Sequence, residues 1–354
     1  MNDRYLIWGG SVSPEIIHKL QAALTHKSIH PDSVTTTIER KSIPVKQTHH
    51  LSPLTDTPLF RGAISLEAFL KHTSLVYRAI VLLIVVVPLL ATALAIGLLW
   101  QRAVHWSDVI LLVTIYTLVA LGVTVGFHRM LTHRSFRPHP VVKLVLLILG
   151  SMSLEGSALE WAATHIKHHA QSDREGDPHS PVEGFFHAHI GWLFSGDQPD
   201  PNVYCRNLVN DRMIVFVSRT FPLWSILAFV IPFAIGGWSG LLWGGLVRVF
   251  LTHHVTWSVN SVCHTFGKRE FETNDKSRNE WVVGLLGFGE GWHNNHHAFP
   301  RSAFHGLHWW QLDVSGYLIW TLERLGLARE VYRVSPALRA RRLARQAALP
   351  EARA

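Results

Sequence analysis

Histidines recur along the chain at spacings that suit metal binding. The segments HIKHH and HNNHH share the pattern HxxHH. On a helix, positions i, i+3 and i+4 point the same way, so the three rings of each segment are expected to converge on one point. HRMLTH adds two histidines five residues apart, and NSVCH adds an asparagine and a histidine at i and i+4. The four segments supply these residues: His128, His133, His165, His168, His169, Asn260, His264, His293, His296 and His297.

These nine imidazoles indicate a redox metal centre rather than a structural zinc site. Neutral imidazole is a favoured ligand of iron, zinc, copper and nickel. Nine rings are more than one four- to six-coordinate ion can use, so two ions are predicted. Structural zinc usually has four ligands, often thiolates, whereas this chain has two cysteines and no CxxC motif. We therefore expect two iron ions (Fe2+/Fe3+).

The elements that must position the histidines are membrane spans. Of the 354 residues, 48% are hydrophobic and only 16% are charged, which is typical of a membrane-embedded domain. A helix of about 20 apolar residues crosses a ~30 Å hydrocarbon core. Four runs reach about that length: 76–100, 108–127, 214–236 and 238–260. The apolar run 141–154 is too short, so we expect it to lie in the interface or to dip in and return.

This topology brings the four histidine segments to one membrane face. Only the short run separates His133 from His165, two spans separate His169 from His264, and none follows. A helix that left the membrane after His128 would have to unwind before His133, because five residues span about 140° of helical rotation. The turn between the first two spans has a single basic residue, and the turn at 236–240 has none. The positive-inside rule therefore places the histidines and both termini in the cytoplasm.

The two ends of the chain are basic and outside the apolar region. The net charge of +8 is concentrated in residues 1–72 and 324–353. Beside long apolar runs, such charge indicates anionic lipid or phosphorylated substrates rather than nucleic acid. We expect a partly disordered polar arm over 1–72, without a cleaved signal peptide, and a basic tail over 334–354.

The histidine segments resemble the histidine boxes of membrane fatty acyl desaturases. With the flanks EWAATHIKHH and GEGWHNNHHAFP, residues 73–333 are most similar to stearoyl-CoA (Δ9 acyl-CoA) desaturases. The resemblance implies an all-α integral membrane fold with four transmembrane helices and a cytosolic helical cap. The cap would hold a di-iron centre ligated by the nine histidines, with Asn260 acting through a bound water. The implied reaction uses O2 and two electrons to desaturate a C16–C18 acyl-CoA.

The resemblance also implies roles for residues around the acyl chain. Trp161, Thr256 and Trp257 match positions that bend the chain, and Glu155 stands where the family often has Gln. Tyr116 and Ala120 match the closed end of the substrate tunnel. Glu290, Asp173 and Asp177 are placed to orient ligand rings. Ordinary helix packing, or solvated carboxylates, would explain the same residues without a site.

Several alternatives remain open at the sequence level. An acyl-lipid or acyl-carrier-protein desaturase differs only in the head group recognised. A hydroxylase or alkane mono-oxygenase would return oxygen to carbon, and a metal transporter would spread its ligands over both membrane faces. The remaining histidines, such as His179, His189, His253, His305 and His308, are expected to be structural.

Electrons must come from a separate partner. The chain has no HPGG haem motif and no flavin or nicotinamide glycine fingerprint. A ferredoxin, rubredoxin, cytochrome b5-like protein or flavin reductase is therefore expected to dock on the cytosolic face. In the tail, Arg339, Arg342 and Arg345 have near-helical spacing and would suit anionic lipid or an acidic donor, or bind nothing specific.

Overall fold

The computed structural model describes residues 74–101, 104–195 and 198–348. The predicted polar arm over 1–72 and the last six residues of the tail lie outside the described residues. The described chain is mostly helical, and its one small sheet pairs β1 (Arg137–Pro138) with β2 (Ala328–Arg329) in antiparallel register.

Three helical runs are long and apolar enough to cross a membrane: Leu75–Trp100, Trp106–Thr132 and Phe221–Ser261. The first is α3 (Ser74–Trp100), and the third contains α10 (Phe221–Gly240), η4 (Leu241–Val247) and α11 (Arg248–Ser261). Large apolar side chains on α3 and α10 are exposed, including Leu90 and Ile235. A soluble surface rarely carries so many, and lipid contact accounts for them.

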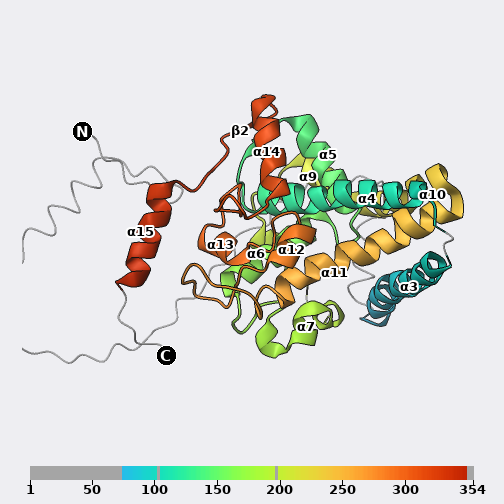
Figure 1. Cartoon of the computed structure of the whole chain (residues 1–354), viewed down its shortest axis with the longest axis horizontal. Helices are drawn as coiled ribbons and strands as arrows, with labels where there is room; N and C mark the ends of the chain where they lie inside the picture. Colours follow the sequence, from blue (N-terminus) through green and yellow to red (C-terminus); the bar gives the residue numbers. More distant parts are fainter. Residues whose placement is uncertain (1–73, 102–103, 196–197, 349–354) are drawn as a thin grey trace, which may run out of the picture. The chain divides into compact units, whose positions relative to one another are not determined.

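The longest run is a hairpin rather than one straight helix. Gly237 has φ 58° and ψ −143°, a conformation that breaks the helix and that glycine adopts readily. Beyond it the chain returns along itself, since a Cβ on Gly240 would lie 2.1 Å from the Pro232 carbonyl oxygen. Arg248 Nη2 also donates to the Ala228 carbonyl at 3.2 Å. The break falls within the predicted turn at 236–240, and α4 packs against both arms (Figure 1).

The start of this hairpin differs from the predicted boundary at 214. A separate helix, α9 (Arg212–Arg219), precedes it and ends at Thr220, and α10 begins at Phe221. Pro222 lies in the first turn of α10, where its missing N–H costs nothing.

The helix that bears His128 widens before it ends. After α4 (Trp106–Leu121) it continues as the π-helix η1 (Gly122–Thr132), with a bond of 3.1 Å from His133 N to His128 O. The expectation that the helix unwinds between these two histidines is wrong. The i→i+5 spacing of a π-helix instead brings the two rings together edge to face, with centroids 4.8 Å apart.

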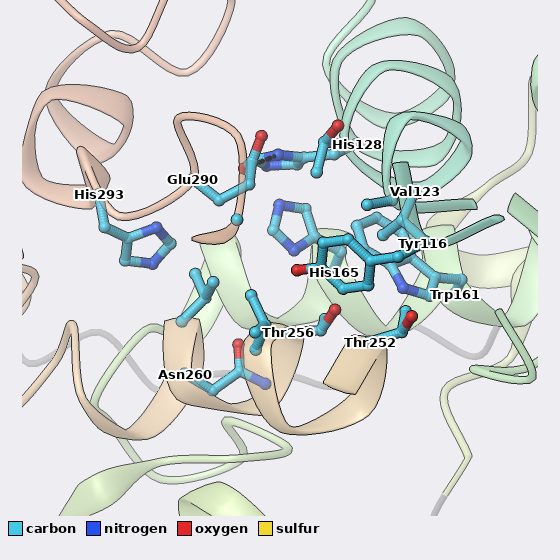
Figure 2. Close-up of a pocket in the computed structure, with 15 residues that line it drawn as sticks. Tyr116, Val123, His128, Trp161, His165, Thr252, Thr256, Asn260, Glu290 and His293 are labelled. Carbon is cyan, nitrogen blue, oxygen red and sulfur yellow. Dashed lines mark ion pairs between the residues drawn. The ribbon is translucent and has the colours of Figure 1, made fainter. Parts of the chain in front are cut away.

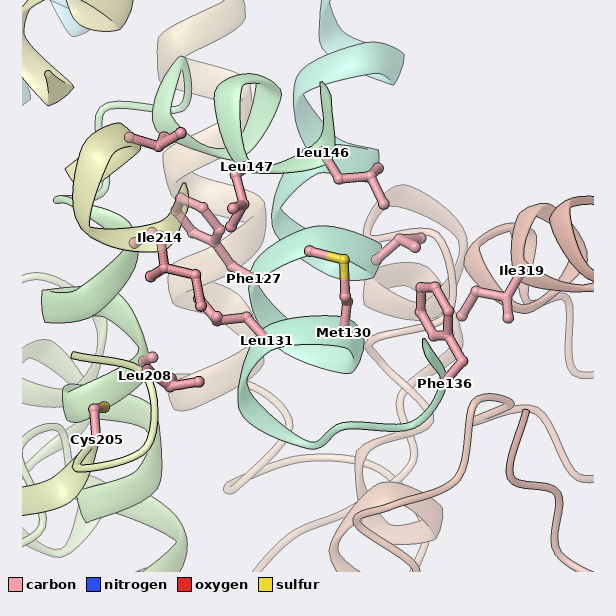
Figure 3. Packing of buried hydrophobic residues seen from close by; sticks show 14 of the residues in the cluster. Phe127, Met130, Leu131, Phe136, Leu146, Leu147, Cys205, Leu208, Ile214 and Ile319 are labelled. Carbon is pink, nitrogen blue, oxygen red and sulfur yellow. The ribbon is translucent and has the colours of Figure 1, made fainter. Parts of the chain in front are cut away.

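A close helix–helix contact and an apolar core fix η1. A Cβ on Gly122 would lie 2.2 Å from Gly150 N in α5 (Pro140–Ser151), the short apolar run. Phe127 and Leu131 of η1 are buried with Leu147 of α5 and Ile214 of α9 (Figure 3). The histidines of HRMLTH therefore project from a rigid element.

The described residues form nine further helices. They are α6 (Ala158–Gln171), η2 (Pro181–Glu183), α7 (Phe185–His189), η3 (Gly191–Phe194), α8 (Pro201–Tyr204), α12 (Trp281–Leu286), α13 (His293–Ala298), α14 (Val314–Arg324) and α15 (Pro336–Ala347).

Candidate metal centre

The nine predicted histidines form two groups in which the potential ligand atoms all lie within 4.8 Å of one another. The first group, called the five-histidine group, contains His128, His133, His165, His169 and His296. The second, called the four-histidine group, contains His168, His264, His293 and His297.

Each HxxHH segment divides between the two groups. On α6, His165 and His169 belong to the five-histidine group and His168 to the other. On α13 the division is reversed. His296 belongs to the five-histidine group, whereas His293 and His297 belong to the four-histidine group. The expectation that each segment converges on a single point is wrong. Adjacent residues are 100° apart on a helix, so positions i+3 and i+4 diverge and serve two neighbouring centres.

Within each group the Nε2 atoms face one another. In the five-histidine group, His133 and His165 approach to 2.9 Å and His128 and His296 to 3.1 Å. In the four-histidine group, His293 lies 3.0 Å from His264. Two nitrogens bound at right angles to one ion, each about 2.1 Å from it, are about 3 Å apart. The spacing therefore suits nitrogens that share a metal ion.

Carboxylates orient four of the rings from behind. In each pair the ring Nδ1–H donates to the carboxylate, which leaves Nε2 directed into its group. The pairs are His128 with Glu290, His168 with Asp177, His264 with Asp173, and His297 with Asp275.

The carboxylate partners differ partly from those the sequence indicated. Asp173 reaches His264 rather than a histidine of its own helix, and Glu290 reaches His128 rather than nearby His293. Asp275 was not predicted, because it lies 22 residues from His297 and no local spacing connects them.

Burial favours the neutral form of several of the clustered rings. It lowers the pKa of His165, His169, His293 and His296 well below the ordinary value, and the neighbouring histidines lower it further. A neutral imidazole is the form that ligates metals. Burial opposes ionisation of Asp173, but the hydrogen bonds from His264 and from the Lys276 backbone N–H favour its carboxylate, and the pKa falls.

The residues present fit a pair of metal ions. Nε2 of His168 is buried within the four-histidine group and has no hydrogen-bond partner, as expected of a nitrogen reserved for an ion. The donor set is neutral imidazole backed by carboxylates, which suits iron, zinc or copper.

An apolar cavity opens onto both groups. Figure 2 shows His128, His165 and His293 on its walls together with Thr256 and Asn260. Tyr116, Ala120, Trp161 and Thr256 of the predicted tunnel line it, and so do these apolar residues: Val123, Val255 and Val259.

Two residues predicted for the tunnel, Glu155 and Trp257, are not among the residues that line this cavity. Glu155 Oε2 accepts from Trp161 Nε1 at 3.0 Å, and Trp161 rather than Glu155 lines the cavity. Trp257 is buried, with its ring centroid 4.9 Å from that of His253. Glu155 supports Trp161, which in turn stacks on His165 at 5.0 Å.

The two asparagines of HNNHH have a role that the sequence did not indicate. Asn294 Oδ1 accepts from the backbone N–H groups of Glu270 and Phe271 at 2.8 and 2.7 Å. Asn295 Nδ2 donates to the His305 carbonyl oxygen at 2.9 Å. Both side chains are buried, so they anchor the short helix that carries three histidines.

The other histidines have separate surroundings. His253 Nε2 donates to the Ser153 carbonyl at 2.8 Å, and His189 lies 3.1 Å from His254. His308 contacts Glu270 at 3.1 Å. His305 is buried, with its ring 4.5 Å from His296.

Comparisons with known proteins agree with this geometry. A family model described as fatty acid desaturase matches residues 105–314. The chain is similar to the hex-5-enoyl-[acyl-carrier protein] acetylenase of Moorena producens, with 40% identity over 267 residues, which cover 70% of this chain and 83% of that protein. It is 40% identical over 229 residues to the sn-1 stearoyl-lipid 9-desaturase of Anabaena variabilis, covering 64% and 84%. It is 42% identical over 214 residues to the acyl-CoA C20 Delta5-desaturase of Anemone leveillei, covering 59% and 69%.

Proposed function

Because the chain belongs to the fatty acid desaturase family, we propose that it introduces a double bond into a saturated acyl chain with O2 at a pair of histidine-bound irons. The substrate chain is C16–C18 and the bond is formed at Δ9. The desaturase domain covers residues 73–333.

The observation that carries this proposal is the cavity beside the histidines. Its walls combine Ala120, Val123 and Val255 with His128 and His293, one from each group. An alkyl chain suits such walls, and a methylene held there would lie beside both groups. Tyr116 donates its hydroxyl to the Leu286 carbonyl at 2.7 Å, so this polar atom is satisfied without a ligand.

The chemistry that bound iron would supply is the reduction of O2 to two waters, using two electrons from the acyl chain and two from a donor. Both leaving hydrogens come from unactivated methylenes, which no protein base can ionise. The protein therefore acts by positioning and by excluding water. Trp161 and Thr256 fix the chain path, while Glu290 and Asp173 hold ligand rings in orientation.

The chain is proposed to be an integral membrane protein that crosses the membrane four times. The hairpin at Gly237 supplies two crossings from the longest apolar run. The basic ends support a cytoplasmic position for the histidines and both termini, because the positive-inside rule favours basic segments on that side.

Expression in a host that lacks its own desaturase tests the proposal. Gas chromatography with mass spectrometry of the host lipids is expected to reveal a new monounsaturated chain of C16 or C18. If iron-loaded protein is present and no double bond forms, the proposal fails. A hydroxylated chain instead would indicate a mono-oxygenase. Purified protein supplied with stearoyl-CoA, stearoyl-lipid and stearoyl-carrier protein then identifies the carrier.

A further inference from the structure

Two surface segments contact each other beside the four-histidine group. Asp173 Oδ2 accepts from His264 Nδ1 at 2.9 Å and from the backbone N–H of Lys276 at 2.6 Å. Asp275, next to Lys276, accepts from His297 Nδ1 at 2.9 Å. Asp173 has φ 58°, which a non-glycine residue seldom adopts, and its two hydrogen bonds hold it there. Segments 173–176 and 265–278 are therefore fixed to each other and to the rings beneath, and we call them the two-loop surface.

The outward side of the two-loop surface is basic. Arg174 and Lys276 each follow an aspartate that faces inward, and both are exposed. The backbone of exposed Lys268 is bridged to Asn279, and the neighbouring Arg278 donates to the Gly267 carbonyl at 3.2 Å. None of these four cations forms an ion pair with a carboxylate of the described residues.

The acidic residues of the same segments are mostly engaged elsewhere. Glu272 faces Arg269 at 3.6 Å, and Glu270 pairs with Arg339 of α15 at 2.6 Å. Among the described residues of the two-loop surface, Glu175 is the remaining exposed acid. Among the charged side chains without an ion-pair partner in these described segments, four cations therefore face the solvent beside one acid, Glu175.

The two-loop surface also offers a short route to a buried ring. His264 and His293 are 2% and 1% exposed, so a protein donor cannot touch them. From the surface, the route to His264 consists of the Lys276 N–H, the Asp173 carboxylate and the imidazole, joined by two hydrogen bonds.

We propose that the two-loop surface docks an acidic protein that carries one electron. The proposal rests on the proposed function, which needs two electrons and two protons from outside for each double bond formed. Two carrier molecules dock in turn, and each is oxidised by one electron at the surface above His264. The four unpaired cations attract the negative carrier and set its orientation, which raises the association rate.

The test measures binding of an acidic [2Fe–2S] ferredoxin to the full-length, iron-loaded enzyme in nanodiscs. The double variant Arg174→Glu/Lys276→Glu is expected to weaken binding about ten-fold at low salt and to flatten its salt dependence. Lys276 holds Asp173 through its backbone N–H, so the reversal preserves that bond, and iron content per chain checks this. The milder Arg174→Gln/Lys276→Gln pair should give a smaller loss in the same direction.

Charge reversals at other exposed cations are the controls that show whether the partner binds the two-loop surface. Arg206→Glu, at an exposed cation after α8, and Arg341→Glu/Arg345→Glu, on the exposed side of α15, should leave binding within about two-fold. Unchanged binding in the two-loop variant, or an equal loss in the α15 variant, overturns the proposal. So does tighter binding of anionic vesicles than of ferredoxin through the same residues.

A small reductant separates docking from the proposed function. Dithionite needs no docking surface. Enzyme that is first reduced with stoichiometric dithionite without O2 and then exposed to O2 should form the double bond in a single turnover to the same extent in the wild type and Arg174→Glu/Lys276→Glu. A wild-type enzyme that forms no double bond with dithionite contradicts the proposed function, whereas the ferredoxin binding result still decides the docking surface.

Discussion

Nη1 of Arg129 lies 2.8 Å from Oδ1 of Asp313, although 184 residues separate them in the chain. Arg129 is wholly buried in η1, directly after His128, and its Nη2 also donates to Glu290 at 3.1 Å. Glu290 in turn orients the His128 ring. Asp313 accepts from the backbone N–H groups of His305 and Gly316 at 2.6 and 2.8 Å. The buried Arg129 guanidinium thus links the segment HRMLTH to the part of the chain that follows HNNHH.

Substituting Arg129 should therefore destabilise the whole site. Arg129→Met leaves two buried carboxylates without their cation, and breaking a buried pair costs about 3–5 kcal/mol. Thermal unfolding of the protein in detergent measures the change. Arg137→Met removes an exposed pair with Glu330 and should cost about 0–1 kcal/mol. Equal midpoints for the two variants would show that the buried network contributes little.

The contact between η1 and α5 predicts a second effect on stability. A Cβ on Gly122 meets backbone atoms of Gly150 and Leu149 at 2.2 and 2.4 Å, and backbone cannot rotate away. Gly122→Ala should cost about 1–3 kcal/mol through overpacking. Gly97→Ala on α3 is the matched control, because no atom lies within 4 Å of its Cβ and alanine favours helices. Unfolding midpoints that fall for Gly122→Ala and hold or rise for Gly97→Ala would support the contact.

Removing a carboxylate that orients a ligand ring should release metal from the group that contains this ring and not from the other group. In Asp275→Ala the Nδ1–H of His297 loses its acceptor, and removal of such a partner typically lowers metal affinity about 10–100-fold. Metal analysis after dialysis against a chelator should give about one ion per chain instead of two, since only the four-histidine group is affected. Glu330→Ala, which removes an exposed carboxylate, should retain both. Loss of all metal from Asp275→Ala would contradict two separable groups.

The sequence predicted which nine histidines lie close together better than how they are divided between two groups. Spacing and span parity sufficed to bring together residues as distant as His128 and His293, because both follow from one-dimensional patterns. The division of each HxxHH between two groups depends on the 100° step between neighbours and on where two helices meet. Asp275 and Arg129 act across long sequence separations, so no local spacing could indicate their partners. The π-helix at η1 depends on packing against α5, which the apolar pattern of 108–127 does not encode.

The cavity predicts a change in preferred chain length. Ala120 is buried in the cavity wall, so Ala120→Phe fills space that the proposed acyl chain would occupy. A misfit of one methylene or more changes kcat/KM by about 10–200-fold. Mass spectrometry of the products should show C18 chains falling relative to shorter ones. Leu118→Phe, on the exposed face of the same helix, should keep the wild-type ratio. An unchanged ratio in Ala120→Phe would place the chain elsewhere.

The buried carboxyl of Glu155 should make the free energy of unfolding depend on pH. Burial raises the pKa of its carboxyl from the ordinary value of 4.5 to about 7, although hydrogen bonds with Thr256 and Trp161 oppose the rise. Between these two values the folded protein binds more protons than the unfolded chain. The free energy of unfolding therefore falls as pH rises through this window and changes no further above it.

Replacing this carboxyl with an amide isolates the effect. Between pH 5.5 and 8.5 the loss attributable to Glu155 is about 2 kcal/mol, at 1.36 kcal/mol for each pH unit up to 7. Glu155→Gln keeps an acceptor for Trp161 Nε1 and cannot ionise, so its unfolding midpoint should fall less between these pH values than that of the wild type. Glu330→Gln, at an exposed carboxylate, should follow the wild type. If Glu155→Gln shows the full wild-type fall, the pH dependence arises from other groups and the Glu155 carboxyl ionises without cost beside Trp161.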